Sequence, residues 1–354
     1  MMTMEEILKG AVEKGASDIF IGAGRHIIYK IDGVITPQDS EILNLEKAVE
    51  IVTQLFETGK RSMDRYHEHG DDDFTISIKG LSRFRVNAYK QRTSMAAVIR
   101  LIHFDIPHYE DLGIPKDVMR IAEESHGIVL VTGPAGSGKT TTLACIIDQI
   151  NKHRNCHIIT LEDPIEFLHR DDKSIISQRE IEVDTDSYMT ALRACLRQAP
   201  DIILLGEMRD HETIRTAMTA AETGHLVIST LHTVGAVNTI DRIIDVFPAD
   251  QQQQIRIELA MLLKSVVSQK LIPAKDGGLV PAFEIMNTNS AIRTLIREAK
   301  AHQIDGVIQT SSTEGMISMD QYLMKLYNNG QITTYAAIEH AVNPEQFTRR
   351  VMAT

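Results

Sequence analysis

The sequence predicts an α/β protein with a smaller α+β domain at its N-terminus, a larger domain built on a parallel sheet, and a helical C-terminal region. Between about residues 116 and 247, short apolar runs alternate with helical stretches, which is typical of parallel strands covered on both faces. Before them, period-two alternation at 74–78 and 83–89 indicates an antiparallel sheet. A stretch at 103–115 with two prolines and a glycine separates the two patterns.

The first domain is expected to span residues 1–105, with residues 106–115 as a linker. Apolar spacing predicts helices over 4–14 and 45–55. Strands are expected as two short segments within 19–31, and at 74–78, 83–89 and 95–102.

The second domain is expected to span 116–354. Its predicted strands are 128–132, 157–161, 201–205 and 225–231, and a helix is expected over 140–150. From about 248 the chain is expected to be mostly helical, with helices over 251–271, 291–301, 318–328 and 334–341.

Composition narrows the classes of function. The net charge of −11 over 354 residues argues against a broad nucleic-acid-binding surface. Three widely spaced cysteines support neither a zinc ribbon nor a disulfide framework, and they fit a reducing cytoplasm. Because no run approaches 18 apolar residues, no direct membrane insertion is expected.

Residues 133–140 read Gly-Pro-Ala-Gly-Ser-Gly-Lys-Thr, directly after the apolar run 127–132. This is a complete phosphate-loop motif between a strand and a helix, a context that disfavours a chance match. Lys139 would reach the β- and γ-phosphates and the Thr140 hydroxyl would bind Mg²⁺. The motif therefore indicates a nucleoside triphosphate, with a predicted binding set of Gly133, Ala135, Gly136, Ser137, Gly138, Lys139, Thr140 and Thr141.

Two acidic segments follow apolar strands. Glu207 comes after the strand at 201–205, where it would orient a water molecule or hold Mg²⁺ through one; a solvated loop acid is the alternative. Glu162, Asp163 and Glu166 crowd another strand end, and crowded carboxylates favour a bound cation. The alternative there is a helix-initiating turn at Asp163-Pro164.

Two histidines bracket the strand at 225–231. His232 stands at the carboxyl end, where ligands bind in open α/β sheets, so it is the better candidate for sensing the γ-phosphate or the acidic cluster. For His225 the alternative is an ordinary core histidine.

Arginines form a further set. Arg193 and Arg197 are four residues apart on a predicted helix over 189–198, so they would share a face. Arg85 and Arg100 lie in the first domain. An arginine from an adjoining domain or subunit would stabilise charge at the γ-phosphate, and surface ion pairing is the alternative.

Four motifs stand in order along the chain: GPAGSGKT, EDPIE, GEMRD and GHLVISTLHT. Together they resemble the secretion ATPase superfamily of type II secretion and type IV pili, over nearly the entire chain. Within it the chain is similar to the pilus retraction ATPases. Its first domain opens with Gly15-Ala16-Ser17-Asp18, it carries AIRTLIRE at 291–298, and it has no Cys-x-x-Cys pair of the kind found in many other members. The resemblance also implies that the extra N-terminal domain of many other members is not expected here. Thr294 and Ala135 depart from the family motifs without removing a catalytic group.

The resemblance implies a PAS-like N-terminal domain and a RecA-like ATPase domain in a hexameric ring that binds ATP and Mg²⁺. It implies Thr140, Glu207 and Glu166 at the metal. The implied catalytic residues are Glu207, Glu166, Glu162, His232, His225, Arg85 and Arg100. Those implied to support the nucleotide site are Arg193, Arg197 and Arg209.

The function implied is ATP hydrolysis that powers type IV pilus retraction, in the cytoplasm at the inner membrane, with a pilus platform protein as partner. The helix at 291–301 would dock there through Arg293, Arg297 and Lys300, unless these form a merely solvated face. The alternatives are an extension, secretion or accessory ATPase of the same superfamily, and a scaffold that binds ATP with negligible turnover. A nucleic-acid translocase is disfavoured by the net charge and by the lack of a stacking platform.

Overall fold

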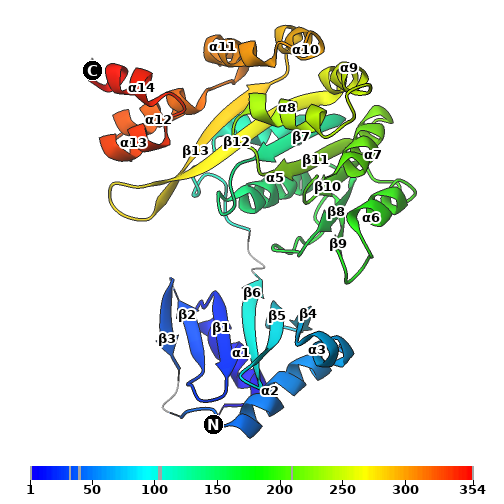
Figure 1. Ribbon diagram of the computed structural model, residues 1–354, viewed down its shortest axis with the longest axis vertical. Coiled ribbons are helices and arrows are strands. Elements are labelled where there is room, and N and C mark those ends of the chain that lie inside the picture. The colour runs from blue at the N-terminus through cyan, green and yellow to red at the C-terminus, as the bar shows by residue number, and fades with distance from the viewer. Residues whose placement is uncertain (1, 32, 39–40, 103–105, 209, 353–354) are drawn as a thin grey trace. The chain divides into compact units, whose positions relative to one another are not determined.

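The computed structural model describes residues 2–31, 33–38, 41–102, 106–208 and 210–352 (Figure 1). The chain divides into two units. Unit 1 comprises Met1–Asp105 and Glu166–Leu168, and unit 2 comprises Ile106–Ile165 and His169–Thr354.

Unit 1 is built on an antiparallel sheet. Its elements are α1 Met4–Glu13, β1 Asp18–Gly22, β2 Ile28–Ile31, β3 Val34–Pro37, α2 Leu45–Thr58, α3 Asp64–His69, β4 Asp71–Ile78, β5 Ser82–Gln91 and β6 Ser94–Ile102. The strand order is β3-β2-β1-β6-β5-β4, with every neighbouring pair antiparallel. Apolar residues of α1 and α2 pack with the inward residues of these strands in one core. The predicted α+β architecture is confirmed, and β3 is an edge strand that was not predicted.

Unit 2 is built on a mostly parallel sheet. Its strands are β7 Gly127–Thr132, β8 His157–Glu162, β9 Ile175–Glu180, β10 Ile202–Leu205, β11 Leu226–Leu231, β12 Leu263–Pro273 and β13 Leu279–Asn287. Their order is β13-β12-β7-β11-β10-β8-β9, and β13 alone of these runs antiparallel to its neighbour. Every residue of β7, β10 and β11 is buried, which explains their continuous apolar sequences.

Helices cover both faces of this sheet. They are α4 Lys116–Met119, α5 Lys139–His153, α6 Tyr188–Cys195, α7 His211–Glu222, α8 Ala236–Asp245, α9 Gln252–Leu262, α10 Ser290–Arg297, α11 Ile304–Thr310, α12 Met319–Asn328, α13 Thr334–His340 and α14 Pro344–Met352. One core joins the sheet to α4, α5 and α12–α14, and a second joins it to α6–α11. Among the residues that the structure describes, the helices are too short or too polar to span a bilayer.

Strand β12 corrects the long helix predicted over 251–271. α9 ends at Leu262, and the next residue starts a strand that pairs with β7 on one side and β13 on the other. The C-terminal region is mostly helical, as predicted, but it also contributes this two-stranded hairpin to the central sheet. The unpredicted β9 extends the sheet at its other edge.

The segment 106–115, predicted as a linker, is packed on unit 2. Ile106 and Leu112 lie against the core that contains α5, and Ile114 is buried in it. The Cys145 thiol donates a hydrogen bond to the carbonyl oxygen of Pro107 at 3.4 Å. These contacts make the segment part of unit 2 rather than a free connection.

Candidate functional site

The carboxyl ends of four adjacent strands meet at one edge of the unit 2 sheet. The glycine-rich loop follows β7, His232 follows β11, Glu207 comes two residues after β10, and Glu162 ends β8. Ligands of open parallel sheets bind at this edge, where loops converge on the strand ends. The fold therefore brings four separate sequence motifs to one place.

The loop at 133–140 has the backbone of a phosphate-binding loop. Gly133, Gly136 and Gly138 have φ values of 143°, 75° and 86°, which glycine adopts without a steric penalty. α5 starts at Lys139, so its first free N–H groups and its partial positive charge face the loop. This geometry suits an anion such as a phosphate group.

The side chains of the loop point in several directions. Lys139 Nζ donates hydrogen bonds of 2.9 Å to the carbonyl oxygens of Gly133 and Pro134. Ser137 is buried, and its hydroxyl has no hydrogen-bond partner among the described residues. Ala135 is exposed, whereas Thr140 and Thr141 are half-buried in the first turn of α5. The loop thus carries a cation and an unused hydroxyl beside its backbone N–H groups.

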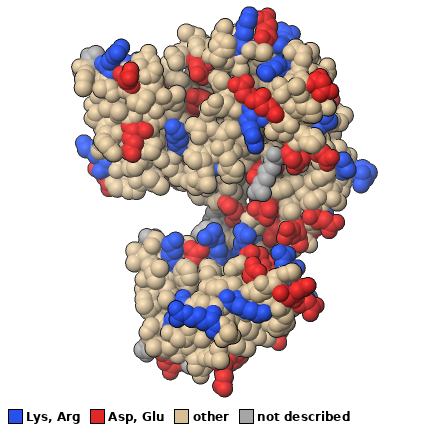
Figure 2. All heavy atoms as spheres, viewed as in Figure 1, with Lys and Arg blue, Asp and Glu red and all other residues tan. Residues whose placement is uncertain are grey.

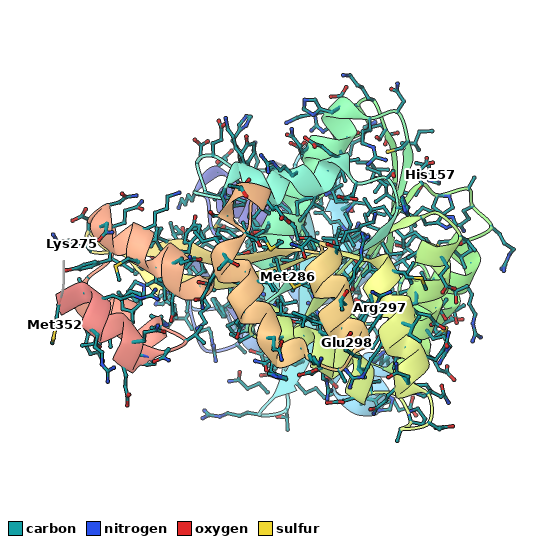
Figure 3. The ribbon with its side chains drawn as sticks, turned by 90° about the horizontal axis from the view of Figure 1, so that it is seen from above. His157, Lys275, Met286, Arg297, Glu298 and Met352 are labelled. Atoms are coloured by element: carbon teal, nitrogen blue, oxygen red, sulfur yellow. The ribbon has the colours of Figure 1, made fainter. Side chains whose placement is uncertain are left out.

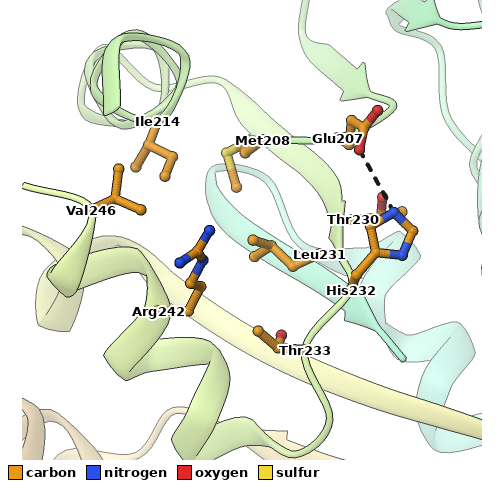
Figure 4. A pocket seen from close by; sticks show the side chains of 9 residues that line it. All are labelled: Glu207, Met208, Ile214, Thr230, Leu231, His232, Thr233, Arg242 and Val246. Atoms are coloured by element: carbon orange, nitrogen blue, oxygen red, sulfur yellow. Dashed lines mark ion pairs between the residues drawn. The ribbon is translucent and has the colours of Figure 1, made fainter. Parts of the chain in front are cut away.

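Glu207 and His232 lie next to each other at one side of a pocket (Figure 4). Glu207 Oε2 lies 3.7 Å from His232 Nε2, and the carboxylate is mostly buried while the imidazole is mostly exposed. The cavity measures about 550 Å³ and is lined by Glu207, Met208, Ile214, Thr230, Leu231, His232, Thr233, Arg242 and Val246. An acid and a base within ion-pair distance at the edge of such a cavity are suited to holding a water molecule there.

The backbone before Glu207 is fixed by β11. The Ser229 hydroxyl donates a 2.7 Å hydrogen bond to the carbonyl oxygen of Leu205, and the Thr230 hydroxyl donates one to that of Gly206. A Cβ atom on Gly206 would lie 2.6 Å from the hydroxyl oxygen of Tyr188, so a larger residue there would displace the Tyr188 side chain. The carboxylate therefore projects from a rigid strand end.

The acidic segment after β8 divides into two parts. Glu162 is buried and accepts hydrogen bonds from Thr160 Oγ1 at 2.6 Å and Gln178 Nε2 at 3.2 Å. Asp163 and Glu166 are exposed. Glu166 belongs to unit 1 and the phosphate loop to unit 2, so the structure does not place Glu166 beside the loop. The next helix begins only at Tyr188, so the alternative of a helix-initiating turn is wrong.

The donor set fits a nucleotide-bound Mg²⁺ rather than a dedicated metal cage. Within the described ranges, no three His, Cys, Asp or Glu side chains come together to hold a metal ion. The expectation of a cation shared by Glu162, Asp163 and Glu166 is thus not supported. Mg²⁺ in phosphate sites needs only one or two protein oxygens, with phosphates and water completing the shell. The Thr140 hydroxyl and the Glu207 carboxylate are oxygens of that kind.

His225 lies at the wrong edge of the sheet for catalysis. It precedes β11, and its carbonyl oxygen accepts from the N–H of Gly127 at the start of β7. A six-residue strand, about 20 Å long, separates it from the edge that carries the phosphate loop. Its Nδ1 contacts the Ala220 carbonyl oxygen at 2.9 Å. These contacts favour the structural alternative for His225, and its catalytic role stays a prediction.

Arg85 and Arg100 are direct cross-strand partners on β5 and β6 of unit 1. Each meets a carboxylate: Arg85 Nε lies 3.8 Å from Asp73, and Arg100 Nε lies 2.9 Å from Asp18. Two like charges at adjacent positions repel, so these acids stabilise the pair. Nothing in unit 1 by itself places either arginine at the nucleotide.

The other predicted arginines do not lie on one helix as expected. α6 ends at Cys195, so Arg193 is helical and Arg197 is not, and the shared helix face predicted for them is wrong. Arg197 Nη1 instead donates to the carbonyl oxygen of Arg193 at 3.2 Å. Arg209 lies outside the described residues.

Two polar residues at the site were missed from sequence. Arg242, on α8, lines the pocket with Glu207 and His232 (Figure 4). Gln269, on β12, is buried against the phosphate loop. Recognising 263–273 as a strand would have placed Gln269 beside the loop, since β12 pairs with β7.

Comparison with known proteins agrees with this geometry. Residues 1–337 match the family described as type II/IV secretion system protein. The chain is 43% identical over 346 residues to the type IV pilus retractation ATPase PilT of Pseudomonas aeruginosa, covering 98% of this chain and 100% of that protein. It is 46% identical over 307 residues to the twitching motility protein of Neisseria gonorrhoeae, covering 86% and 82%. A crystal structure of the pilus retraction motor PilT with bound ADP matches with a TM-score of 0.91 and 44% identity, covering 99% of this chain and 100% of that one. The chain therefore belongs to the type II/IV secretion system protein family.

Proposed function

We propose that the chain is an ATPase that acts as a homohexameric motor for type IV pilus retraction. The observation that carries this proposal is the convergence of the phosphate loop, Glu207 and His232 at one sheet edge. Relatives that share 43% and 46% of its residues are named as a retraction ATPase and a twitching motility protein. The matching PilT structure holds ADP, which supports nucleotide binding here.

The residues at this edge have complementary roles in hydrolysis. The loop N–H groups and Lys139 bind the phosphates, and Thr140 and Glu207 would hold Mg²⁺, directly or through water. When bound, Mg²⁺ would supply positive charge that offsets the charge developing on the phosphate oxygens. Glu207 orients the attacking water, His232 holds the carboxylate in place, and Glu162 supports the neighbouring strand end.

The motor cycle requires a second set of groups. Residues 1–105 form the domain that closes over ATP, and Arg85 and Arg100 supply positive charge at the γ-phosphate when it closes. Glu166, which belongs to the same unit, would approach the site in that step. Arg193, Arg197 and Arg209 support the site or the interface between subunits.

The proposed partner is a pilus platform protein at the inner membrane. The α10 surface would contact it from the cytoplasmic side. Ile292 and Ile296 are buried beneath α10, whereas Arg293 and Arg297 face outward. Figure 3 shows Arg297 and Glu298 at the C-terminal end of this helix. α10 ends at Arg297, and Lys300, beyond it, pairs with Glu298 at 2.7 Å. The proposed contact therefore rests on the two helical arginines.

Nucleic acid is not a proposed partner. On the face that Figure 2 shows, Lys and Arg are interspersed with Asp and Glu over both units. With a net charge of −11, this distribution does not favour a continuous phosphate-binding stripe.

Replacement of the chromosomal gene tests the proposal. Deletion is expected to abolish retraction while pili remain on the cell surface, and the Lys139→Ala allele should behave as the deletion does. Loss of surface pili would indicate an extension ATPase instead. Retraction at normal speed in the Lys139→Ala strain would contradict a role for ATP hydrolysis by this chain.

A further inference from the structure

Strand β12 approaches the phosphate loop closely from the side. A Cβ atom built on Gly133 would lie 2.2 Å from the carbonyl oxygen of Gln269, and one on Gly138 would lie 2.9 Å from Gln269 Nε2. Separations under 3.0 Å do not occur for real Cβ atoms. The two glycines that begin and end the loop therefore face the same residue of β12.

The side chain of Gln269 is held in one orientation. Gln269 is 3% exposed, and its Oε1 accepts a 2.7 Å hydrogen bond from the hydroxyl of Thr142, which is fully buried in α5. An amide whose oxygen is engaged by Thr142 must direct its N–H₂ group to the other side, toward Gly138. One hydrogen bond, between residues 127 positions apart in the sequence, thus holds both the Gln269 amide and the first turn of α5.

The same strand also contacts the loop after His232. Successive side chains of a strand point to opposite faces, so Ser268 lies on the face away from Gln269. Ser268 Oγ accepts a 2.9 Å hydrogen bond from the N–H of Gly235, the residue before α8. β12 therefore touches two of the loops that form the site, and Gln269 is its contact with the phosphate loop.

We infer that Gln269 is a positioning residue that sets the phosphate loop and the first turn of α5 in their nucleotide-binding geometry. It acts through the loop backbone and Thr142. The inference rests on the proposed function, because it takes the loop at 133–140 as the nucleotide site. The predicted defect is in phosphate binding and in turnover, over and above any loss of fold stability.

The test compares four variants of the full-length protein. Gln269→Met keeps the side-chain length and removes the amide, and Thr142→Val removes the hydroxyl from the helix side. Each is expected to weaken ADP binding and to lower kcat for ATP by about tenfold, since small misplacements at a reacting centre cost that much or more. Thr142→Ser keeps the hydroxyl and should stay within about twofold of wild type. Ser265→Ala, on the same strand but bonded to the Met286 carbonyl oxygen, is the matched control.

A double-mutant cycle completes the test. Because the two groups share one bond, the Gln269→Met/Thr142→Val protein should be no worse than the weaker single variant. The inference is overturned if both single variants lower the unfolding temperature yet bind ADP within twofold of wild type. If Gln269→Met fails to fold, the comparison of ADP binding and kcat between Thr142→Val and Thr142→Ser is sufficient to test the inference. Wild-type protein that binds no ADP would refute the proposed function instead, which separates the two failures.

Discussion

Replacing Gly133 with alanine tests how closely β12 is packed on the phosphate loop. Its φ of 143° lies in a region that residues with a Cβ avoid. The added atom would also lie 2.2 Å from the carbonyl oxygen of Gln269 and 2.8 Å from Ser137 Oγ. Main chain cannot rotate out of the way as a side chain can, and β12 is held by strand pairing on both sides.

The two effects of Gly133→Ala add in free energy. Backbone strain of this kind costs about 1–3 kcal/mol, and overpacking against fixed atoms costs about as much again. We therefore expect a loss of about 2–6 kcal/mol from the free energy of unfolding. For a unit of this size that corresponds to a fall of about 5–15 °C in the unfolding temperature.

Gly136→Ala is the matched control, because it is the same change three residues along the same loop. Gly136 also has a positive φ, of 75°, but nothing lies within 4 Å of its added Cβ. It should cost only about 1–2 kcal/mol. Thermal unfolding without nucleotide, followed by circular dichroism, measures both. A fall for Gly133→Ala no larger than that for Gly136→Ala would refute the close packing of β12.

Three further predictions concern activity, an ion pair and pH. Lys139→Ala should lower ATP turnover by about 100-fold or more, since a cation that meets the phosphates is lost; phosphate release above a tenth of the wild-type rate would contradict this. Asp72→Ala should destabilise unit 1 by about 2–4 kcal/mol in urea unfolding, because its fully buried carboxylate receives two 2.9 Å hydrogen bonds from Arg61; a loss below about 1 kcal/mol would oppose it. Burial lowers the pKa of His169 to about 4, so the folded state binds fewer protons than the unfolded state between pH 4 and 6.5. Relative to His169→Phe, the wild type should therefore lose about 2–3 kcal/mol of unfolding free energy as the pH falls from 7 to 4.5. If the difference in unfolding free energy between the two proteins is the same at both pH values, the lowered pKa of His169 is contradicted.

The parallel strands and the phosphate loop could be predicted because their signals are local. Strands buried on both faces must be continuously apolar, and the loop needs its glycines and its lysine at fixed spacing. The difference between His225 and His232 also follows from sequence once strand direction is considered, since only one of them stands at the carboxyl end.

β12 could not be predicted in the same way. Ile255, Leu259, Leu262 and Val266 keep a helical spacing that runs past the true end of α9. Pairing with β7 and β13, which lie far away in sequence, decides the outcome. Gln269 was missed for that reason, because a residue in a supposed helix has no expected place beside the phosphate loop.

The end of α6 could not be predicted from local sequence either, and the prediction for Arg193 and Arg197 depended on it. Apolar and polar residues continue in a helical pattern past Cys195, yet α6 ends there and Ala199 adopts a positive φ of 51°. The packing around that turn, rather than local propensity, sets the end of the helix. Arg193 and Arg197 therefore do not share a helix face, although Arg197 still donates a hydrogen bond to the carbonyl oxygen of Arg193.

The central claim is that Glu207, projecting from β10 beside His232, activates water for ATP hydrolysis at the phosphate loop. Single-turnover hydrolysis by Glu207→Gln, measured together with its affinity for ATP, tests this most directly, because the amide keeps the shape of the side chain and removes its charge. We predict binding within about threefold of wild type and hydrolysis slowed by about 10²–10⁴-fold, the usual contribution of a general base. Hydrolysis within tenfold of the wild-type rate would contradict the claim.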